Sequence, residues 1–404
     1  MEKRNYEQSK KLDNVCYDIR GPVMDEAMRM EARGANILKL NIGNPAPFGF
    51  YAPDEVILDM IYNLRNCEGY SDSRGLFSAR KAIMQYSQIK GLPNVQMEHI
   101  YTGNGVSELI QLSMNALLDN GDEILIPSPA YPLWTACATL AGGHPVHYLC
   151  DEQADWYPDL EDMESKITSA TKALVIINPN NPTGVIYGPE LLKELVEVAR
   201  ENKLLIFSDE IYDRLLLGDA VHVSTASLCP DLPVITFNGL SKSHVVCGFR
   251  CGWMVFSGPG LEEIKSGVMQ LAAMRLCGNA LTQLVIPAAL RDDASTHAML
   301  VPGGRLYEQR KATVEGLSGI PGITFLPNHA CFYIFPGIDT ALYDFESDQD
   351  FALKFLHEKK VLVIPGRGFD WHEDLRFRIV MLPEPQVLSD AMGALGDFLR
   401  DHRR

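Results

Sequence analysis

The sequence predicts an α/β protein with a mixed, mostly parallel sheet, helices on both sheet faces and a smaller α+β domain. Three observations support this fold class. Short apolar segments alternate with helical segments through the middle of the chain. Several of these segments, such as KALVIINP at 172–179, lack polar alternation, which indicates strands covered on both faces. After about residue 300 the pattern changes to strands divided by loops, which indicates a second unit.

The N-terminal part predicts three elements in order. Residues 17–34 are typical of a strand or turn followed by an amphipathic helix that ends at Gly34. The segment 37–50 starts as a short strand and then breaks into a loop rich in Gly and Pro. Residues 53–66 are expected to be helical, with a Pro-Asp start.

The middle of the chain predicts helices and strands in alternation. The helices have apolar residues at helical spacing, followed by Gly or polar turns. They are expected at 107–121, 131–143 and 189–203. The strands are short apolar segments, expected at 122–129, 144–150, 172–179, 204–210, 233–239 and 251–258.

The C-terminal part predicts a smaller α+β unit that the N-terminal segment completes. Its helices are expected at 303–319, 350–360 and 385–404. Its strands are expected at 323–327, 331–336, 361–366 and 376–382. We therefore expect an arm (1–16), a small domain (17–64 with 300–404) and a large domain (65–299).

Composition narrows the classes of function. The 404 residues include 36 Lys and Arg against 52 Asp and Glu, and a net charge of −16 disfavours a nucleic acid partner. No stretch of about 20 apolar residues predicts a membrane span, and the polar N-terminus lacks the core of a signal peptide. The nine cysteines form no C-x-x-C pair and the histidines are dispersed. We therefore expect a cytoplasmic protein with reduced thiols and no metal site.

Chemically useful side chains follow five apolar segments. In an open α/β sheet, ligands bind beyond the carboxyl ends of the strands, so these side chains are expected to meet in one site. The segments concerned are Gly103–Ser107, Pro129–Tyr131, Asn178–Gly184, Asp209–Tyr212 and Gly239–Lys242.

Each segment alone has an ordinary structural explanation as well. The Gly-rich turn at 103–107 offers backbone amides to an anion, but it is also a common helix start. Asp209 could face a cationic ring nitrogen, cap a helix or pair with Arg214. Lys242, eight residues before Arg250, could be an amine nucleophile or a surface charge.

Taken together, the motifs resemble the fold-type I, class I aminotransferases, which use pyridoxal 5′-phosphate. The similarity rests on NPNNPTG (178–184), SDEIY (208–212) and GLSKSHVVCGFRCGW (239–253), in the family's order, and it spans about residues 17–400. YDIRGP (17–22), LNIGNPAPFGF (40–50) and MRLC (274–277) are similar to bacterial alanine aminotransferases of the AlaA type.

The resemblance implies the pyridoxal-phosphate transferase fold type I, with amino acids and 2-oxo acids as substrates. It also implies a homodimer with shared active sites. The expected reaction moves an amino group between L-alanine and a 2-oxo acid, in the 2-oxoglutarate/pyruvate couple, with ping-pong kinetics. Alternatives are a C–S β-lyase on the same fold, or an aminotransferase for valine, aspartate or aromatic donors.

The resemblance also assigns roles to individual residues. The implied catalytic residues are Lys242, which binds the cofactor covalently and moves the α-proton, Asp209 on the pyridinium nitrogen and Tyr212 on the ring oxygen. The other implied cofactor-binding residues are Asn181, Tyr131, Arg250, Ser241, the amides of Gly105, Val106 and Ser107, and Tyr70 of the neighbouring subunit. The implied substrate-binding residues are Arg378, Asn181 and Gly43.

Several positions differ from the family pattern or stay ambiguous. Gly239 stands where some relatives have Ser or Thr, Cys251 replaces an aliphatic residue, and Ala330-Cys331 replaces a frequent Gly. Arg275 could bind an anion at the site entrance or be a solvated helix residue. Arg376 lies two residues from Arg378, so on a strand both would point to the same side. Trp134 and Trp253 are expected in the core.

Overall fold

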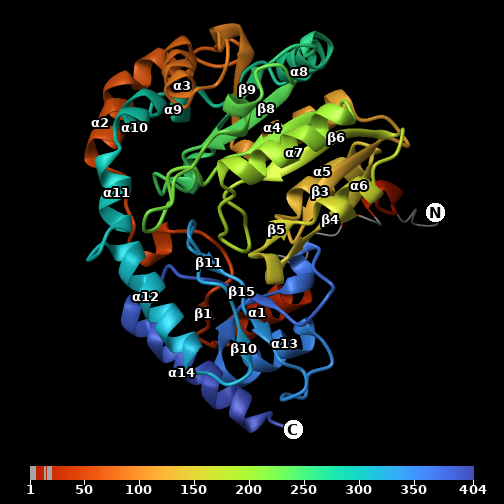
Figure 1. The fold of residues 1–404 in the computed structure, drawn as a ribbon. Helices are drawn as coiled ribbons and strands as arrows, with labels where there is room; N and C mark the ends of the chain where they lie inside the picture. Colours follow the sequence, from red (N-terminus) through yellow and green to blue (C-terminus); the bar gives the residue numbers. More distant parts are fainter. Residues whose placement is uncertain (1–5, 13–14, 16–20) are drawn as a thin grey trace, which may run out of the picture.

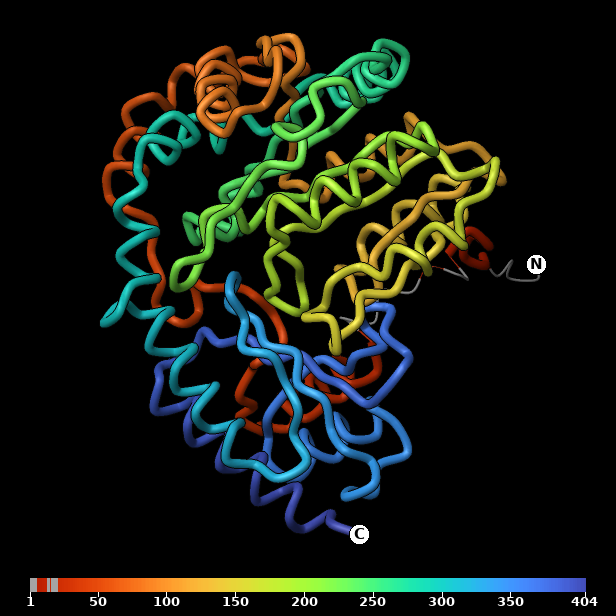
Figure 2. Tube along the Cα trace, viewed as in Figure 1, coloured from red at the N-terminus to blue at the C-terminus, as the bar shows by residue number. Residues whose placement is uncertain are grey.

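The computed structural model describes residues 6–12, 15 and 21–404. The predicted arm therefore lies partly outside the described residues, and so does the strand or turn predicted at the start of 17–34. Figures 1 and 2 show two regions, a large-sheet region above and a second region below that combines the chain's N-terminal and C-terminal parts.

The large-sheet region contains eight strands in the order β2-β9-β8-β7-β6-β3-β4-β5. Their bounds are β2 Ile100–Asn104, β3 Glu123–Ser128, β4 His144–Asp151, β5 Tyr157–Pro158, β6 Thr171–Ile177, β7 Leu205–Asp209, β8 Val234–Gly239 and β9 Cys251–Ser257. Strands β4, β3, β6, β7 and β8 run parallel, while β9 is antiparallel to both of its neighbours. The prediction of a mixed, mostly parallel sheet is confirmed.

Helices cover both faces of this sheet because successive strand residues point to opposite sides. Ile124 and Ile126 pack toward one set of helices: α4 Val106–Leu117, α5 Leu133–Leu140 and α8 Glu262–Met274. Leu125, between them, packs toward the other set: α3 Phe77–Ile89, α6 Leu160–Ser165, α7 Pro189–Glu201 and α10 Ile286–Arg291. The two-sided burial explains why the strands lack polar alternation.

The second region has its own apolar core, between the helices α1 Pro22–Ala32, α12 Arg305–Ser318, α13 Asp348–Lys359 and α14 Pro385–Asp401 and several short strands. These strands are β1 Leu38–Lys39, β10 Ile323–Thr324, β11 Tyr333–Ile334, β12 Gly337–Ile338, β13 Val361–Leu362, β14 Ile364–Pro365 and β15 Phe377–Val380. Strand β1 pairs in parallel with β13, so the N-terminal segment completes this region, as Figure 2 shows. The domain boundaries at 64 and 300 stay a prediction.

The remaining elements are shorter helices and 3-10 turns. They are α2 Asp54–Asn63, α9 Ala280–Gln283, α11 Ala294–Leu300 and 3-10 turns at Lys10–Leu12, Ala46–Phe48, Leu64–Cys67, Met97–His99, Glu152–Ala154, Thr225–Leu228, Cys247–Phe249 and Gly366–Phe369. The long helices α3 and α8 were not predicted, and neither were the short helices α6, α9, α10 and α11. The buried face of α3 includes Arg80 and Ser87, which hides its apolar pattern, whereas α8 buries Ile264, Val268 and Ala272 at a readable spacing of four.

Candidate active site

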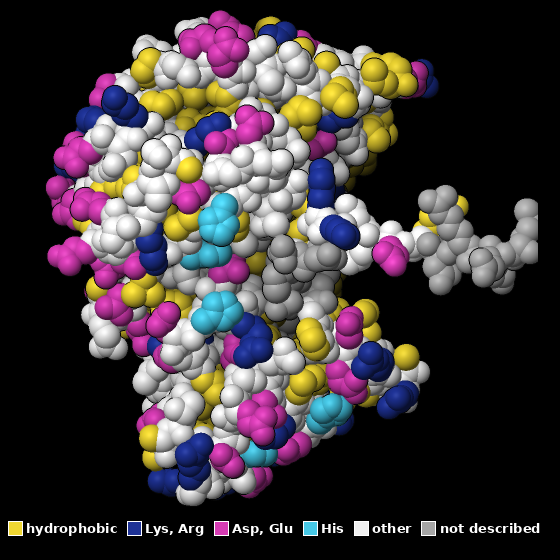
Figure 3. Space-filling model, turned by 90° about the vertical axis from the view of Figure 1, so that its right-hand side faces the viewer, with side chains coloured by type: hydrophobic (Ala, Val, Ile, Leu, Met, Phe, Trp, Pro, Cys, Tyr) yellow, Lys and Arg dark blue, Asp and Glu magenta, His cyan; other side chains and the backbone are white. Residues whose placement is uncertain are grey.

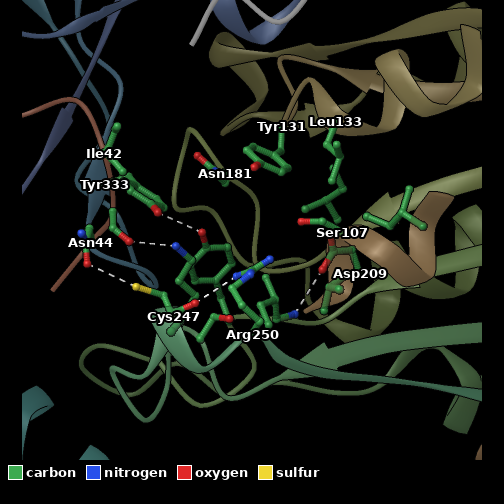
Figure 4. Close-up of a pocket in the computed structure, with 18 of the residues that line it drawn as sticks. Ile42, Asn44, Ser107, Tyr131, Leu133, Asn181, Asp209, Cys247, Arg250 and Tyr333 are labelled. Carbon is green, nitrogen blue, oxygen red and sulfur yellow. Dashed lines mark hydrogen bonds between the residues drawn. The ribbon is translucent and has the colours of Figure 1, made fainter. Parts of the chain in front are cut away.

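A cavity of about 540 Å³ lies at the carboxyl ends of the parallel strands, between the two regions. Figure 4 shows its two walls. Asp209, Ser107 and Leu133 face it from the large-sheet region, and Ile42, Asn44 and Tyr333 face it from the opposite side. Apart from Gly105 and Tyr70, every residue predicted for the site from the sequence lines this cavity.

Lys242 lies just beyond the end of β8 and is partly buried. Its Nζ donates a hydrogen bond of 2.9 Å to the carbonyl oxygen of Gly43, on the other wall. The amine therefore lies where the two regions meet.

Asp209 ends β7, and its side chain is buried at the cavity floor. The Nε1 of Trp134 donates to its carboxylate at 3.2 Å, and the backbone N–H of Ile211 donates at 3.3 Å. Burial nevertheless raises the pKa of Asp209 to about 6. Among the described residues no cation forms an ion pair with it, and Arg214 instead contacts Tyr86 and Asp293. The alternative of an Asp209–Arg214 pair is therefore wrong.

Arg250 and the N-terminus of α4 form a second charged corner. Arg250 donates to the carbonyl oxygens of Cys247 at 3.0 Å and Asn104 at 3.4 Å, and no described acidic residue forms an ion pair with it. Val106 and Ser107 begin α4, so their N–H groups have no helical partner and point toward the cavity end of the helix. This corner combines a guanidinium, a helix N-terminus and the lining hydroxyl of Ser241.

The predicted amide contact of Gly105 needs correction. Its N–H already donates to the carbonyl oxygen of Arg250 at 2.9 Å. Gly105 has a φ of 75°, and a Cβ there would lie 2.4 Å from the Nη2 of Arg250. The glycine thus makes room for the guanidinium rather than offering its amide.

Arg378 leaves β15 toward the cavity, where it contacts neutral groups. Its Nη1 donates to the Oδ1 of Asn181 at 2.7 Å, and its Nη2 donates to the carbonyl oxygen of Asn41. Its guanidinium carbon lies 4.4 Å from the ring centre of Tyr333 and 4.6 Å from that of Phe369. The guanidinium is therefore held in place by acceptors and rings on several sides.

Arg376 does not line the cavity, although it lies only two residues away. It pairs with Glu152 and with Asp374, and it stacks 4.7 Å from the ring centre of Trp156. Of the two arginines, only Arg378 therefore lines the cavity, whereas Arg376 is held by carboxylates outside it. Trp134 and Trp253 are buried in the core as predicted, and Trp134 additionally contacts Asp209.

Tyr212 and Tyr333 form a pair that lines the cavity. The Oη of Tyr212 donates to the Oη of Tyr333 at 3.0 Å, and both side chains are buried. Burial, with the nearby Tyr333, raises the pKa of Tyr212 far above its ordinary value, so its hydroxyl stays a neutral donor. Sequence reasoning did not single out Tyr333, nor the lining residues Ile42, Asn44, Leu133 and Cys247.

The departures from the family pattern have local explanations. A Cβ on Gly239 would lie 2.7 Å from the carbonyl oxygen of Cys251, so glycine is required there by packing. Cys331 takes a φ of 63°, which costs a side chain roughly 1–2 kcal/mol and which glycine adopts freely. Neither Ala330 nor Cys331 lines the cavity, and both are buried beside Tyr333.

Besides Gly105, Tyr70 and Arg275 also lie outside this cavity. The side chain of Tyr70 is 83% exposed, so it does not reach the site of its own chain. Arg275 ends α8, donates to the carbonyl oxygen of Thr102 at 2.9 Å and lies 3.5 Å from Glu108. It is therefore not a solvated helix residue, and the structure leaves its role as an anion-binding residue a prediction.

The cavity residues fit pyridoxal 5′-phosphate by charge and by chemistry. A buried carboxylate without a counter-charge suits a protonated ring nitrogen. A guanidinium beside a helix N-terminus suits a phosphate. The amine of Lys242 lines the same cavity and suits an aldehyde carbon as its covalent partner.

Comparison with known proteins agrees with this geometry. Residues 35–395 match the family model described as aminotransferase class I and II. The chain belongs to this aminotransferase family. It is 52% identical to the glutamate-pyruvate aminotransferase AlaA of Haemophilus influenzae, over 99% of this chain and 100% of the relative. It is 49% identical to the alanine aminotransferase of Mycobacterium tuberculosis, over 99% of this chain and 94% of that protein.

Solved structures of aminotransferases share the whole fold. An aminotransferase from Escherichia coli superposes with a TM-score of 0.97 at 52% identity, covering 99% of this chain and 100% of that one. An alanine aminotransferase from Pyrococcus furiosus gives a TM-score of 0.93 at 36% identity, covering 98% and 100%. The chain is therefore a pyridoxal-phosphate-dependent aminotransferase of fold type I.

The described residues contain neither a candidate metal site nor a helix that could span a membrane. Within residues 6–12, 15 and 21–404, no group of three or more His, Cys, Asp or Glu side chains could hold a metal ion. None of the helices in that part combines the length and the apolar character needed to cross a bilayer. On the face drawn in Figure 3, Lys and Arg side chains are scattered among Asp and Glu side chains.

Proposed function

We propose that this aminotransferase moves the amino group between L-alanine and a 2-oxo acid, in the 2-oxoglutarate/pyruvate couple. The names of the relatives that are 49% and 52% identical support this substrate pair. The observation that carries the proposal is the cavity itself, which is lined by Asp209 at the end of β7, by Lys242 just after β8 and by Arg378 of β15.

The residues of the large-sheet wall are proposed to hold the cofactor. Asp209 would bind the ring nitrogen, Tyr212 and Asn181 the ring oxygen, and Tyr131 the ring face. Arg250, Ser241 and the amides of Val106 and Ser107 would bind the phosphate. When bound, pyridoxal 5′-phosphate supplies an electron sink for the bond that breaks at the substrate's α-carbon.

The residues of the opposite wall are proposed to orient the substrate. The two Nη groups of Arg378 would bind the α-carboxylate bidentately, with Asn181 as a second donor. Gly43 and its neighbours would cover the substrate. Lys242 would then act as the base that removes the α-proton, since its Nζ lies at the boundary between the two walls.

A homodimer with shared active sites is part of this proposal. The exposed Tyr70 would complete the phosphate site of the neighbouring subunit. Further large apolar side chains are exposed on the same stretch of chain, at the end of α8 and on the segment that follows it: Tyr51, Leu58, Ile61, Tyr62, Leu64, Phe77, Met274, Leu276 and Leu281. An interface there would bury them. A cytoplasmic location stays a prediction of the sequence.

The test is a panel of amino donors, including alanine, glutamate, valine, aspartate and phenylalanine, against pyruvate and 2-oxoglutarate. We expect the alanine/2-oxoglutarate and glutamate/pyruvate pairs to have the highest kcat/KM. A preference for another donor would contradict the substrate assignment. Pyruvate and ammonia released from cystathionine without any 2-oxo acid would favour the C–S β-lyase instead.

A further inference from the structure

Tyr333 lines the cavity but has no part in the assignments proposed above. It begins β11 and is 2% exposed. Its Oη lies 3.0 Å from the Oη of Tyr212, and its ring lies 4.4 Å from the guanidinium carbon of Arg378. A Cβ on Gly43 would lie 2.2 Å from the same Oη. One side chain thus contacts the groups proposed for the cofactor, for the substrate carboxylate and for the covering segment.

The hydroxyl of Tyr212 has a single hydrogen, and this limits its bonds. The two hydroxyl oxygens lie 3.0 Å apart, and either hydroxyl can donate to the other. Donation by Tyr212 to the ring oxygen of the cofactor uses its only hydrogen, so the bond between the two tyrosines then needs Tyr333 as its donor. Tyr333 would then donate to Tyr212, and Tyr212 would donate to the ring oxygen, in a chain whose bonds strengthen each other.

We propose that Tyr333 is a positioning residue that directs the hydroxyl of Tyr212 toward the cofactor's ring oxygen, while its ring supports Arg378. This inference rests on the proposed function, because it needs the cofactor in this cavity. The two contacts come from different parts of one side chain. They can therefore be separated by substitution.

Tyr333→Phe removes the hydroxyl and keeps the ring over Arg378. Tyr333→Leu removes both. Tyr148→Phe is a matched control, because Tyr148 is also fully buried, and its hydroxyl donates at 2.8 Å to the carbonyl oxygen of Val175, outside the cavity. The readouts are the pH titration of the bound cofactor's visible absorbance, and kcat and KM for the amino donor.

In Tyr333→Phe we expect the midpoint of the absorbance titration to rise by about half to one pH unit. The reason is that weaker donation leaves more negative charge on the ring oxygen, which holds the neighbouring proton more tightly. We expect kcat to fall about threefold to tenfold, the worth of one hydrogen bond, with KM changed less than twofold. Tyr333→Leu should in addition raise KM about tenfold, and Tyr148→Phe should match the wild type.

A double-mutant cycle with Tyr212→Phe tests whether Tyr333 acts through Tyr212. We expect Tyr333→Phe to have no further effect on the titration midpoint in the Tyr212→Phe background. Equal shifts in both backgrounds, or a Tyr333→Phe enzyme with the wild-type midpoint, would overturn the inference. Failure of the proposed function looks different, because the wild-type protein would then have no cofactor absorbance to titrate.

Discussion

Two clusters of charged side chains in this protein, one around the buried Arg376 and one around the buried Asp209, are built in opposite ways. At the junction of the regions, Arg376 pairs with Glu152 and Asp374 and stacks on Trp156. In the cavity, Asp209 and Arg250 form no ion pair with any described residue. In the first cluster, Arg376 has carboxylate partners of opposite charge. In the second, neither Asp209 nor Arg250 has a partner of opposite charge among the described residues.

The difference shows how a structural charge can be told from a functional one. Burial of a charge costs free energy unless a partner offsets it, so a complete cluster holds the fold together. An incomplete cluster costs stability until a ligand supplies the missing charges. The junction cluster therefore serves the fold, and the cavity cluster serves the ligand.

Asp209→Asn is expected to have the largest effect on catalysis. It removes the negative charge that we propose faces the ring nitrogen, and it should lower kcat about 100-fold to 1000-fold, as the loss of one catalytic electrostatic contact does. Steady-state kinetics with alanine and 2-oxoglutarate measures this. A kcat within tenfold of the wild type would contradict an electrostatic role of Asp209 in catalysis.

The same substitution should have the opposite effect on the stability of the cofactor-free protein. Burial raises the pKa of Asp209 from 3.8 to about 6. Protonation of Asp209 therefore stabilises the folded state below about pH 4, and this stabilisation is lost as the pH rises through 6. By urea denaturation at pH 8, the free energy of unfolding of cofactor-free Asp209→Asn should therefore exceed that of the wild type by about 1–3 kcal/mol. The difference should be smaller at pH 5. Equal stability at both pH values would contradict the view that the cavity is electrostatically incomplete.

Arg376→Met tests the complete cluster. It leaves the carboxylates of Glu152 and Asp374 without their cation and should lower the free energy of unfolding by about 3 kcal/mol. Urea denaturation of the holoenzyme measures this. KM of the folded enzyme should stay within about threefold, and a large rise in KM at unchanged stability would mean that Arg376 binds substrate.

Arg378→Lys tests the neighbouring arginine of the cavity. Lysine keeps the charge but loses the planar fork, so we expect KM for alanine to rise about 10-fold to 100-fold. Cofactor absorbance and the free energy of unfolding should change little. A stability loss as large as that of Arg376→Met would show that the two arginines do the same structural work.

Gly43→Ala is expected to have the smallest effect. The new Cβ would lie 2.2 Å from the Oη of Tyr333 and 2.8 Å from the ring of Phe332, so the segment at 42–44 must shift. Such overpacking costs about 1–2 kcal/mol, which should raise KM about 10-fold without loss of bound cofactor. Unchanged KM would indicate that this segment does not cover the substrate.

Much of this site could be predicted from the sequence because its residues follow apolar strands. Asp209 ends β7, and Lys242 and Asn181 lie a few residues beyond the ends of β8 and β6. The strand ends of a parallel sheet meet at one edge. Tyr333 lies inside the apolar run CFYIFP, where the sequence does not tell which face meets the cavity. The amide of Gly105 was assigned wrongly because its acceptor, the carbonyl of Arg250, lies far along the chain.

The central claim is that the ε-amine of Lys242 is the group that binds the cofactor. Borohydride reduction of the holoenzyme, followed by mass spectrometry of its peptides, tests it directly. We predict that the reduced pyridoxyl group is found on the peptide that contains Lys242 and is absent in Lys242→Ala. A label on another lysine, or no label in the wild-type protein, would contradict this account.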